Sequence, residues 1–142
     1  MQQITQLSLY VENRPGALAE ICRILKQNKI NIRTLSLADT QQFGILRMLV
    51  DDPDNAKNVL EKAGMVVKLS GVLALVVPDN AGGLADILEI FDKHQLAVEY
   101  MYAFTFGKAG KAVMVFCFTD ADKALAALAN EAVEVLDAAA LN

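Results

Sequence analysis

The sequence is poor in the residues that most catalytic and metal sites use. Its 142 residues include one histidine, His94, and two cysteines, Cys22 and Cys117, which lie far apart in apolar stretches. One histidine and two isolated thiols cannot supply a convincing set of transition-metal ligands. No nucleophile–base pair or carboxylate pair lies near the glycines. We therefore expect no enzymatic activity, no metal site and no cofactor.

The chain also lacks a basic surface and a long apolar run. Its formal net charge is −4, with acidic and basic residues interspersed, so no cationic stripe is available to bind a phosphate backbone. No stretch of about 18 uncharged apolar residues could span a membrane. The start, Met1-Gln2-Gln3, has neither the basic segment nor the apolar core of a secretory signal. We expect a soluble, cytoplasmic protein that binds neither nucleic acid nor membranes.

What the sequence does contain is an internal repeat. Residues 11–21, Val-Glu-Asn-Arg-Pro-Gly-Ala-Leu-Ala-Glu-Ile, recur 66 positions later as residues 77–87, Val-Pro-Asp-Asn-Ala-Gly-Gly-Leu-Ala-Asp-Ile. Such a repeat indicates duplication of one structural unit. We place the two domains at residues 1–70 and 71–142, with residues 68–71 as a short linker. Units of about 70 residues are near the lower limit for independent stability, so we expect the two halves to share surface.

Hydrophobic periodicity predicts the same order of elements in both halves. Asp52 followed by Pro53 is typical of a helix start, and Gly64 of a helix end. The strands expected in the first half are 4–11, 30–36, 44–50 and 65–69, with helices at 18–28 and 53–63 and a turn at 39–42. The strands expected in the second half are 72–77, 96–106, 112–118 and 133–136, with helices at 84–93 and 122–130.

The order βαββαβ in each half predicts an α+β fold made of two ferredoxin-like units. Each unit is expected to be a four-stranded antiparallel sheet with both helices on one face. Residues 72–77 and 113–118 are apolar at every position, whereas a sheet with one face in water should alternate. The second face must therefore be covered, either by the other half or by a second chain, and we favour a homodimer in which the halves also touch.

The strand, the turn at residues 13–18 and the βαββαβ order together resemble the ACT domain, and the resemblance covers nearly the whole chain twice. It implies a free-standing pair of domains that senses a free amino acid and controls a metabolic enzyme carried on a separate chain. In that family the effector binds where two units meet, between the strand-to-helix turn of one and a strand of its neighbour. The second copy departs from the pattern at Ala81, which replaces the proline, and at Gly83.

The two turns are the candidate ligand-binding sites. Unpaired N–H groups at a helix start attract a carboxylate, and the Asn13 and Asp79 side chains or the carbonyls of a facing strand could accept from the ammonium group. The candidate residues of the first turn are Asn13, Arg14, Pro15, Gly16, Ala17 and Leu18, and those of the second are Asp79, Asn80, Ala81, Gly82, Gly83 and Leu84. The competing interpretation is that Asn13 and Asp79 are ordinary helix caps.

Other assignments stay open at this point. Arg14 either clamps a ligand carboxylate or is simply solvated, and Tyr100, Met101 and Tyr102 either line a side-chain pocket or belong to a core or interface. The apolar flanks favour a branched-chain, aromatic or histidine-like effector over an acidic one. Two functions remain: an amino-acid-binding regulatory protein that acts allosterically, or a structural subunit that uses the folds for dimerisation without binding a ligand.

Overall fold

The computed structural model of the protein describes residues 2–39, 42–104 and 109–141. These residues form two compact units. The first unit is Thr5–Ser70, and the second unit consists of the residues up to Ile4 together with those from Gly71 onward. No helix in the described ranges is long and apolar enough to cross a membrane.

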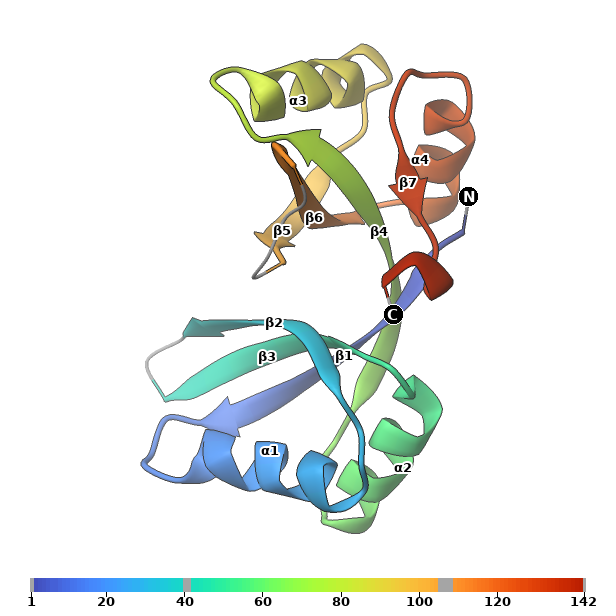
Figure 1. Ribbon diagram of the computed structural model, residues 1–142. Coiled ribbons are helices and arrows are strands. Elements are labelled where there is room, and N and C mark those ends of the chain that lie inside the picture. Colours follow the sequence, from blue (N-terminus) through green and yellow to red (C-terminus); the bar gives the residue numbers. More distant parts are fainter. Residues whose placement is uncertain (1, 40–41, 105–108, 142) are drawn as a thin grey trace. The chain divides into compact units, whose positions relative to one another are not determined.

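The first unit has the predicted βαββαβ order. Its elements are β1 (Ile4–Glu12), α1 (Ala17–Gln27), β2 (Ile32–Asp39), β3 (Phe43–Val50), α2 (Pro53–Lys62) and the start of β4 (Lys68–Pro78). The strands lie in the order β2-β3-β1-β4, and β3 is antiparallel to both of its neighbours. Both helices pack on one face of this sheet (Figure 1).

The second unit repeats the arrangement. After β4 come α3 (Gly83–Lys93), β5 (Val98–Ala103), β6 (Lys111–Phe118), α4 (Ala121–Leu128), β7 (Val135–Leu136) and a short 3₁₀ turn, η1 (Ala139–Leu141). The strand order is β5-β6-β4-β7, and the three pairings are antiparallel. The predicted fold class, two ferredoxin-like units, is therefore confirmed.

The first helix of each unit ends in the same way. Lys29 and Gln95 take left-handed conformations, with φ of 57° and 54°. The next N–H groups then reach back to the helix, from Ile30 to the Leu25 carbonyl and from Leu96 to the Phe91 carbonyl, both at 2.9 Å. This is the closing pattern of a Schellman motif, in which a residue beyond the helix satisfies a carbonyl of its last turn.

That closure corrects two predicted boundaries. The second strand of the first unit begins at Ile32, not at residue 30, and β5 begins at Val98, not at residue 96. Ile30 and Leu96, the apolar residues just before these strands, take part in the hydrogen bonds that close the helices. The apolar–polar alternation therefore begins before the strand does, and it predicts a strand start that is two residues too early. Residues 105 and 106 of the predicted strand and residues 40 and 41 of the predicted turn lie outside the described ranges.

The second helix of each unit is capped as the sequence predicts. The Asp52 carboxylate accepts the Asn55 N–H at 3.2 Å, with Pro53 at the first helical position, and Gly64 follows the helix with φ of 90°. The matching helix α4 has Asp120 as its cap. An acceptor at this position stabilises the N–H groups that the first turn of a helix leaves unpaired.

The predicted linker is wrong. Residues 68–71 lie inside β4, which runs without interruption from Lys68 to Pro78, while Met65 is outside the strand. Gly71 lies within this strand. A Cβ atom at this position would overlap the Gln3 side chain, so the glycine allows the Gln3 side chain to lie against the extended backbone.

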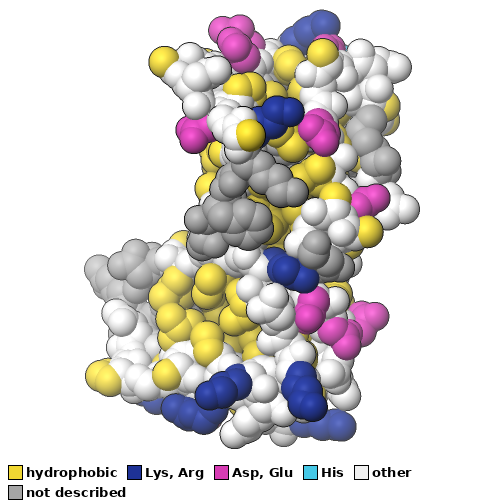
Figure 2. Space-filling model, viewed as in Figure 1, with side chains coloured by type: hydrophobic (Ala, Val, Ile, Leu, Met, Phe, Trp, Pro, Cys, Tyr) yellow, Lys and Arg dark blue, Asp and Glu magenta, His cyan; other side chains and the backbone are white. Residues whose placement is uncertain are grey.

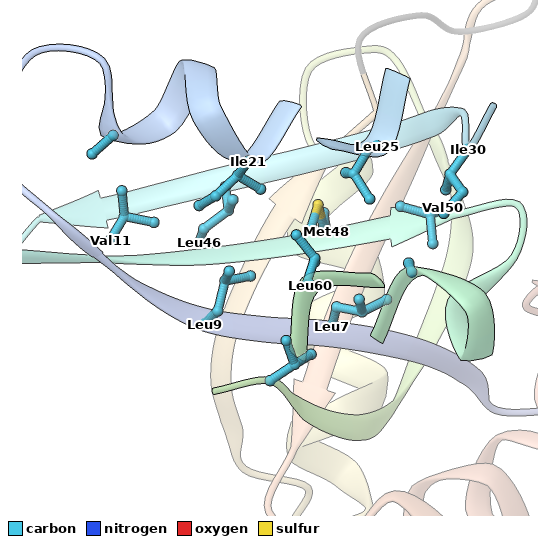
Figure 3. Close-up of a cluster of buried hydrophobic side chains, with 13 residues drawn as sticks. Leu7, Leu9, Val11, Ile21, Leu25, Ile30, Leu46, Met48, Val50 and Leu60 are labelled. Carbon is cyan, nitrogen blue, oxygen red and sulfur yellow. The ribbon is translucent and has the colours of Figure 1, made fainter. Parts of the chain in front are cut away.

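Each unit has its own apolar core. In the first unit, side chains from β1, β3, α1 and α2 point toward one another between the helices and the sheet (Figure 3); they include Leu7, Leu9, Leu25, Leu46, Met48 and Leu60. In the second unit, Phe91 of α3 packs edge-on against Phe116 and Phe118 of β6, with ring centroids 5.0 and 4.9 Å apart. Such edge-to-face pairs add to the stabilisation from burial.

The apolar strands are covered to different extents. Val72, Leu73, Ala74 and Leu75 of β4 have no exposed surface, and Leu73 and Leu75 belong to the core of the second unit. In the first unit, by contrast, Tyr10 is 73% exposed.

Candidate functional site: the first strand-to-helix turn

The first turn connects β1 to α1 through residues 13–16. The Asn13 N–H donates to the Gln42 carbonyl at 3.0 Å, which fixes the turn to the residue that precedes β3. Gly16 stands at the helix N-cap with φ of 88°. No atom lies within 4 Å of the place where its Cβ would be, so a glycine is favoured here by backbone conformation and not by lack of space.

No side chain caps α1 or α3. The interpretation of Asn13 and Asp79 as helix caps is therefore wrong, because Gly16 and Gly82 occupy the cap positions. The Ala17 N–H donates to the Arg14 carbonyl at a long 3.3 Å. Among the described residues, the N–H groups of Gly16 and Leu18 have no acceptor, which leaves donors at the positive end of the helix dipole.

A cleft of about 140 Å³ lies beside this turn. It is lined by Val11, Glu12, Asn13, Arg14, Leu18, Leu37 and Gly44. Three of the six residues predicted for the first turn thus line the cleft. Pro15, Gly16 and Ala17 do not line it; the first two are exposed and Ala17 is buried.

Four lining residues were not predicted as ligand-binding. Val11 and Glu12 end the strand that the turn follows, and Leu37 and Gly44 belong to the hairpin of β2 and β3. The pairing of Leu37 with Leu46 and of Asp39 with Gly44 brings the hairpin beside the turn. The sequence contains no local signal for this approach, because it depends on the register between strands.

Arg14 is already paired with the protein's own carboxylates. Its Nε lies 2.9 Å from Glu12 Oε2, and its Nη2 lies 3.7 Å from Glu20 Oε2. All three side chains are about half exposed, so each pair contributes little to stability. The two carboxylates give the rim of the cleft a net negative charge, because a single guanidinium faces them. Arg14, which the sequence allowed to bind a ligand carboxylate, is instead paired with Glu12 and Glu20 of the protein.

The opposite wall is shaped by a contact between neighbouring strands. A Cβ atom on Gly44 would lie 2.7 Å from Cδ1 of Leu37, well inside van der Waals contact. The Leu37 side chain therefore occupies the space that a side chain at position 44 would need, and it lies over the backbone of β3. Leu37 remains 49% exposed, since β2 is the last strand in the described order of this sheet.

The second turn has the same backbone but a tighter contact with its strand. Gly82 has φ of 90°, and the Asp79 N–H donates to the Gly110 carbonyl at 2.7 Å. Gly83 is buried, and a Cβ atom there would overlap the Pro78 carbonyl oxygen. The predicted residues divide by exposure: Asp79, Asn80, Ala81 and Gly82 are exposed, Gly83 is buried, and Leu84 is half-buried.

The remaining candidate residues do not line the first-turn cleft. Tyr100, Met101 and Tyr102 are half-buried on β5, and Met101 packs against the core of the second unit. A second hollow of about 280 Å³ lies at the start of α4. It is lined by Gln95, Leu96, Ala97, Phe118, Thr119, Asp120 and Lys123, none of which was predicted as a ligand-binding residue.

The single histidine belongs to an ion-pair cluster at the end of α3. His94 Nε2 and Lys93 Nζ lie 2.7 and 2.8 Å from Glu131 Oε1. The hydrogen bond from Lys93, followed by that from His94, holds the pKa of the Glu131 carboxyl below its usual value. The described residues contain no group of three potential metal-binding side chains.

Comparison with known proteins places the chain in a family. The family profile described as an ACT domain pair matches residues 2–141, whereas no curated protein matches the chain. The crystal structure of protein BT0572 from Bacteroides thetaiotaomicron has 32% sequence identity and a TM-score of 0.91. The match covers 99% of this chain and 96% of that one.

Two regulatory subunits of aspartate kinase share the fold at lower identity. The subunit from Thermus thermophilus, in its ligand-free form, is 15% identical, with a TM-score of 0.66 and 90% of each chain covered. The subunit from Thermus flavus is 14% identical, with a TM-score of 0.65, and the match covers 91% of this chain and 90% of that one. Both neighbours agree with the predicted ferredoxin-like architecture.

Proposed function

We propose that this chain, which belongs to the family of ACT domain pairs, is a regulatory protein whose first turn binds a free amino acid. The observation that carries the proposal is the cleft of about 140 Å³ beside a helix start that no side chain caps. A helix start with free N–H groups is suited to a carboxylate. The chain itself is proposed to carry no catalytic step.

The walls of the cleft match the three parts of an α-amino acid. The carboxylate would accept from the N–H group of Leu18, which lines the cleft, and from that of Gly16 at the adjoining helix start. Neither N–H group has a protein acceptor among the described residues. The ammonium group would donate to the amide oxygen of Asn13 or to the carboxylate of Glu12, whose Oε2 alone is used in the pair with Arg14. The ligand side chain would then lie against the apolar residues of the cleft.

We further propose that the protein acts as a homodimer that passes ligand occupancy to an enzyme on a separate chain. The first unit exposes large apolar side chains on its strands: Tyr10 at 73%, Leu37 at 49%, Phe43 at 45% and Leu35 at 38%. Figure 2 shows hydrophobic side chains gathered over the hairpin of β2 and β3. Tyr10 and Phe43 pair with Ile45 and Glu12 on one face of the sheet, whereas Leu35 and Leu37 pair with the core residues Met48 and Leu46 and share their face. Exposed apolar side chains such as Leu35 and Leu37 are typical of an interaction site. A second copy placed there would border the cleft through Leu37 and couple binding to the interface.

Thermal unfolding in the presence of each of the twenty amino acids tests the proposal. A ligand at 100 times its dissociation constant should stabilise the protein by about 2.7 kcal/mol. The matched variants are Gly16→Val and Gly82→Val, because the two glycines share the same left-handed φ and the same open surroundings. The strain of substitution is therefore equal, and only Gly16→Val should lose the response to the amino acid.

A second variant avoids backbone strain. Glu12→Gln removes one carboxylate at the exposed rim while keeping its size, so the fold should be unaffected. If Glu12 accepts from the ligand ammonium, the variant should bind the amino acid about tenfold more weakly. Unchanged affinity in both Gly16→Val and Glu12→Gln would place the ligand elsewhere.

The alternative function is a dimerisation subunit that binds no effector. The exposed side chains of Tyr10 and Phe43 favour it equally well, since they require a partner but no ligand. Under this alternative none of the twenty amino acids changes the unfolding temperature, while light scattering still reports a dimer. The two measurements together separate a sensor from a scaffold.

A further inference from the structure

We infer that the effector of the first-turn cleft is a small, neutral, aliphatic amino acid, and that Leu37, lying over Gly44, sets the upper limit on its size. This inference rests on the proposed function and names the ligand class for the same site. It depends on three features of the described residues: the volume of the cleft, the charge of its rim, and the contact between two neighbouring strands.

The volume of the cleft limits the ligand. An engineered cavity of about 150 Å³ takes up benzene, a molecule of six carbon atoms, and the cleft has a volume of about 140 Å³. The shared part of an amino acid, its ammonium, α-carbon and carboxylate, already fills most of that space. The remainder favours a small side chain, as in alanine or valine, over an aromatic ring, which would have to extend out of the open side of the cleft.

The rim selects against an acidic side chain. Glu12 and Glu20 place two negative charges around the single guanidinium of Arg14, so the local charge is negative. A ligand with a second carboxylate would add repulsion without finding a free cation. The side chains of Val11, Leu18 and Leu37, which form the interior walls, offer no hydrogen bond to a polar ligand side chain. A neutral aliphatic group is the chemistry that these walls match.

Leu37 forms the wall that a larger ligand would meet first. Because Gly44 has no Cβ atom, the Leu37 side chain can lie flat over β3; a Cβ there would come within 2.7 Å of Leu37 Cδ1. Shortening Leu37 should therefore enlarge the cleft. Adding a methyl group at position 44 should lift Leu37 away from the sheet and narrow the cleft. Position 37 and position 44 thus control size in opposite directions.

The test is calorimetric titration of the full chain with alanine, valine, phenylalanine and aspartate. Wild-type protein should bind valine about tenfold or more tightly than phenylalanine, a difference within reach of an apolar pocket. In Leu37→Ala the affinity for phenylalanine should rise to within about twofold of the affinity for valine. Gly44→Ala should weaken the binding of free valine more than the binding of free alanine. Aspartate should bind more weakly than valine to every variant.

Leu35→Ala is the matched control. Leu35 is also a partly exposed leucine on β2, two residues from Leu37, but it does not line the cleft. It should leave the ratio of valine to phenylalanine affinity unchanged. If wild-type protein binds phenylalanine as tightly as valine, or if Leu37→Ala does not change the ratio, the size limit assigned to Leu37 is wrong while amino acid binding stands. If none of the four ligands binds and the remaining amino acids also fail, both the inference and the proposed function fall.

Discussion

The two strand-to-helix turns share a backbone and differ in what surrounds it. Gly16 and Gly82 take nearly the same left-handed conformation, with φ of 88° and 90°, and no side chain caps either helix. In both turns the first residue, Asn13 or Asp79, donates its N–H to the carbonyl just before the third strand of its unit. The duplication has therefore kept the main-chain geometry that presents N–H donors.

The side chains near the turns have diverged. Leu37 lies over Gly44 in the first unit, and the positions that match them in strand register are Ala103 and Ala112. Leu37 and Gly44 combine a long side chain with a residue that has none, whereas Ala103 and Ala112 each carry a single methyl group. The strand end also differs, because Glu12 of the first unit corresponds to a proline in the second. Donors at a helix start are thus common to both copies, and we expect the walls to decide what each turn can hold.

The largest expected difference between the turns is steric. Gly83→Ala places a Cβ atom against the Pro78 carbonyl, and a backbone group cannot move aside as a flexible side chain can. We expect a loss of about 3 kcal/mol in the free energy of unfolding, at the upper end of overpacking effects. The reverse change in the first unit, Ala17→Gly, should cost only about 1 kcal/mol. Urea unfolding of both variants measures the two losses in the free energy of unfolding. If Gly83→Ala loses less than Ala17→Gly, the second turn is not the more tightly packed one.

A smaller effect should be equal in the two turns. Gly16→Ala and Gly82→Ala each force an L-residue into the left-handed region, where space is open but the conformation is unfavourable. We expect each variant to lose about 1 kcal/mol. Hydrogen exchange at the start of α1 and of α3 measures the two losses separately. Clearly unequal losses would contradict the claim that the duplicated backbones are equivalent.

The smallest effect concerns charge at the far end of α3, where the units also differ. Lys93 and His94 of the second unit correspond to Gln27 and Asn28, so the described part of the first unit has no matching ion-pair cluster. Because the pKa of Glu131 is lowered in the folded protein, its pairing stabilises the fold above the usual carboxyl pKa. That stability is lost as the pH falls through the lowered value.

Glu131→Gln should therefore unfold at a lower temperature than the wild type near neutral pH, and the two should converge once the pH falls below the lowered pKa of Glu131. Thermal unfolding across this pH range is the measurement. Glu89→Gln, which removes an exposed carboxylate of α3 outside the cluster, serves as the control for the loss of a negative charge. A constant difference between Glu131→Gln and wild type at all pH values would show that the pairing has no role in the acid response.

Much of this architecture could be predicted because the responsible signals are local. Asp52 and Pro53 predicted the start of α2 from two adjacent residues, and the repeated turn predicted both copies of the fold. The left-handed ends at Lys29 and Gln95 could not be predicted in this way, because neither residue is the glycine that usually marks such an end. The apolar residues that follow therefore looked like strand.

The cleft could be predicted only in part for a related reason. Asn13 and Leu18 follow directly from the turn, but Leu37 approaches it through the pairing of β2 with β3, which is a property of the hairpin and not of any short segment. The same applies to β4. Its residues 68–71 look like a linker in isolation, and they become strand through pairing with their neighbours.

The most direct test of the central claim is an amide NMR titration of the full chain with valine. The account predicts that the resonances of Gly16 and Leu18 move first and saturate, while those of Gly82 and Leu84, in the same backbone geometry, stay in place at the same valine concentration. Movement confined to the second turn, or no movement at either turn when valine is in large excess, would contradict it.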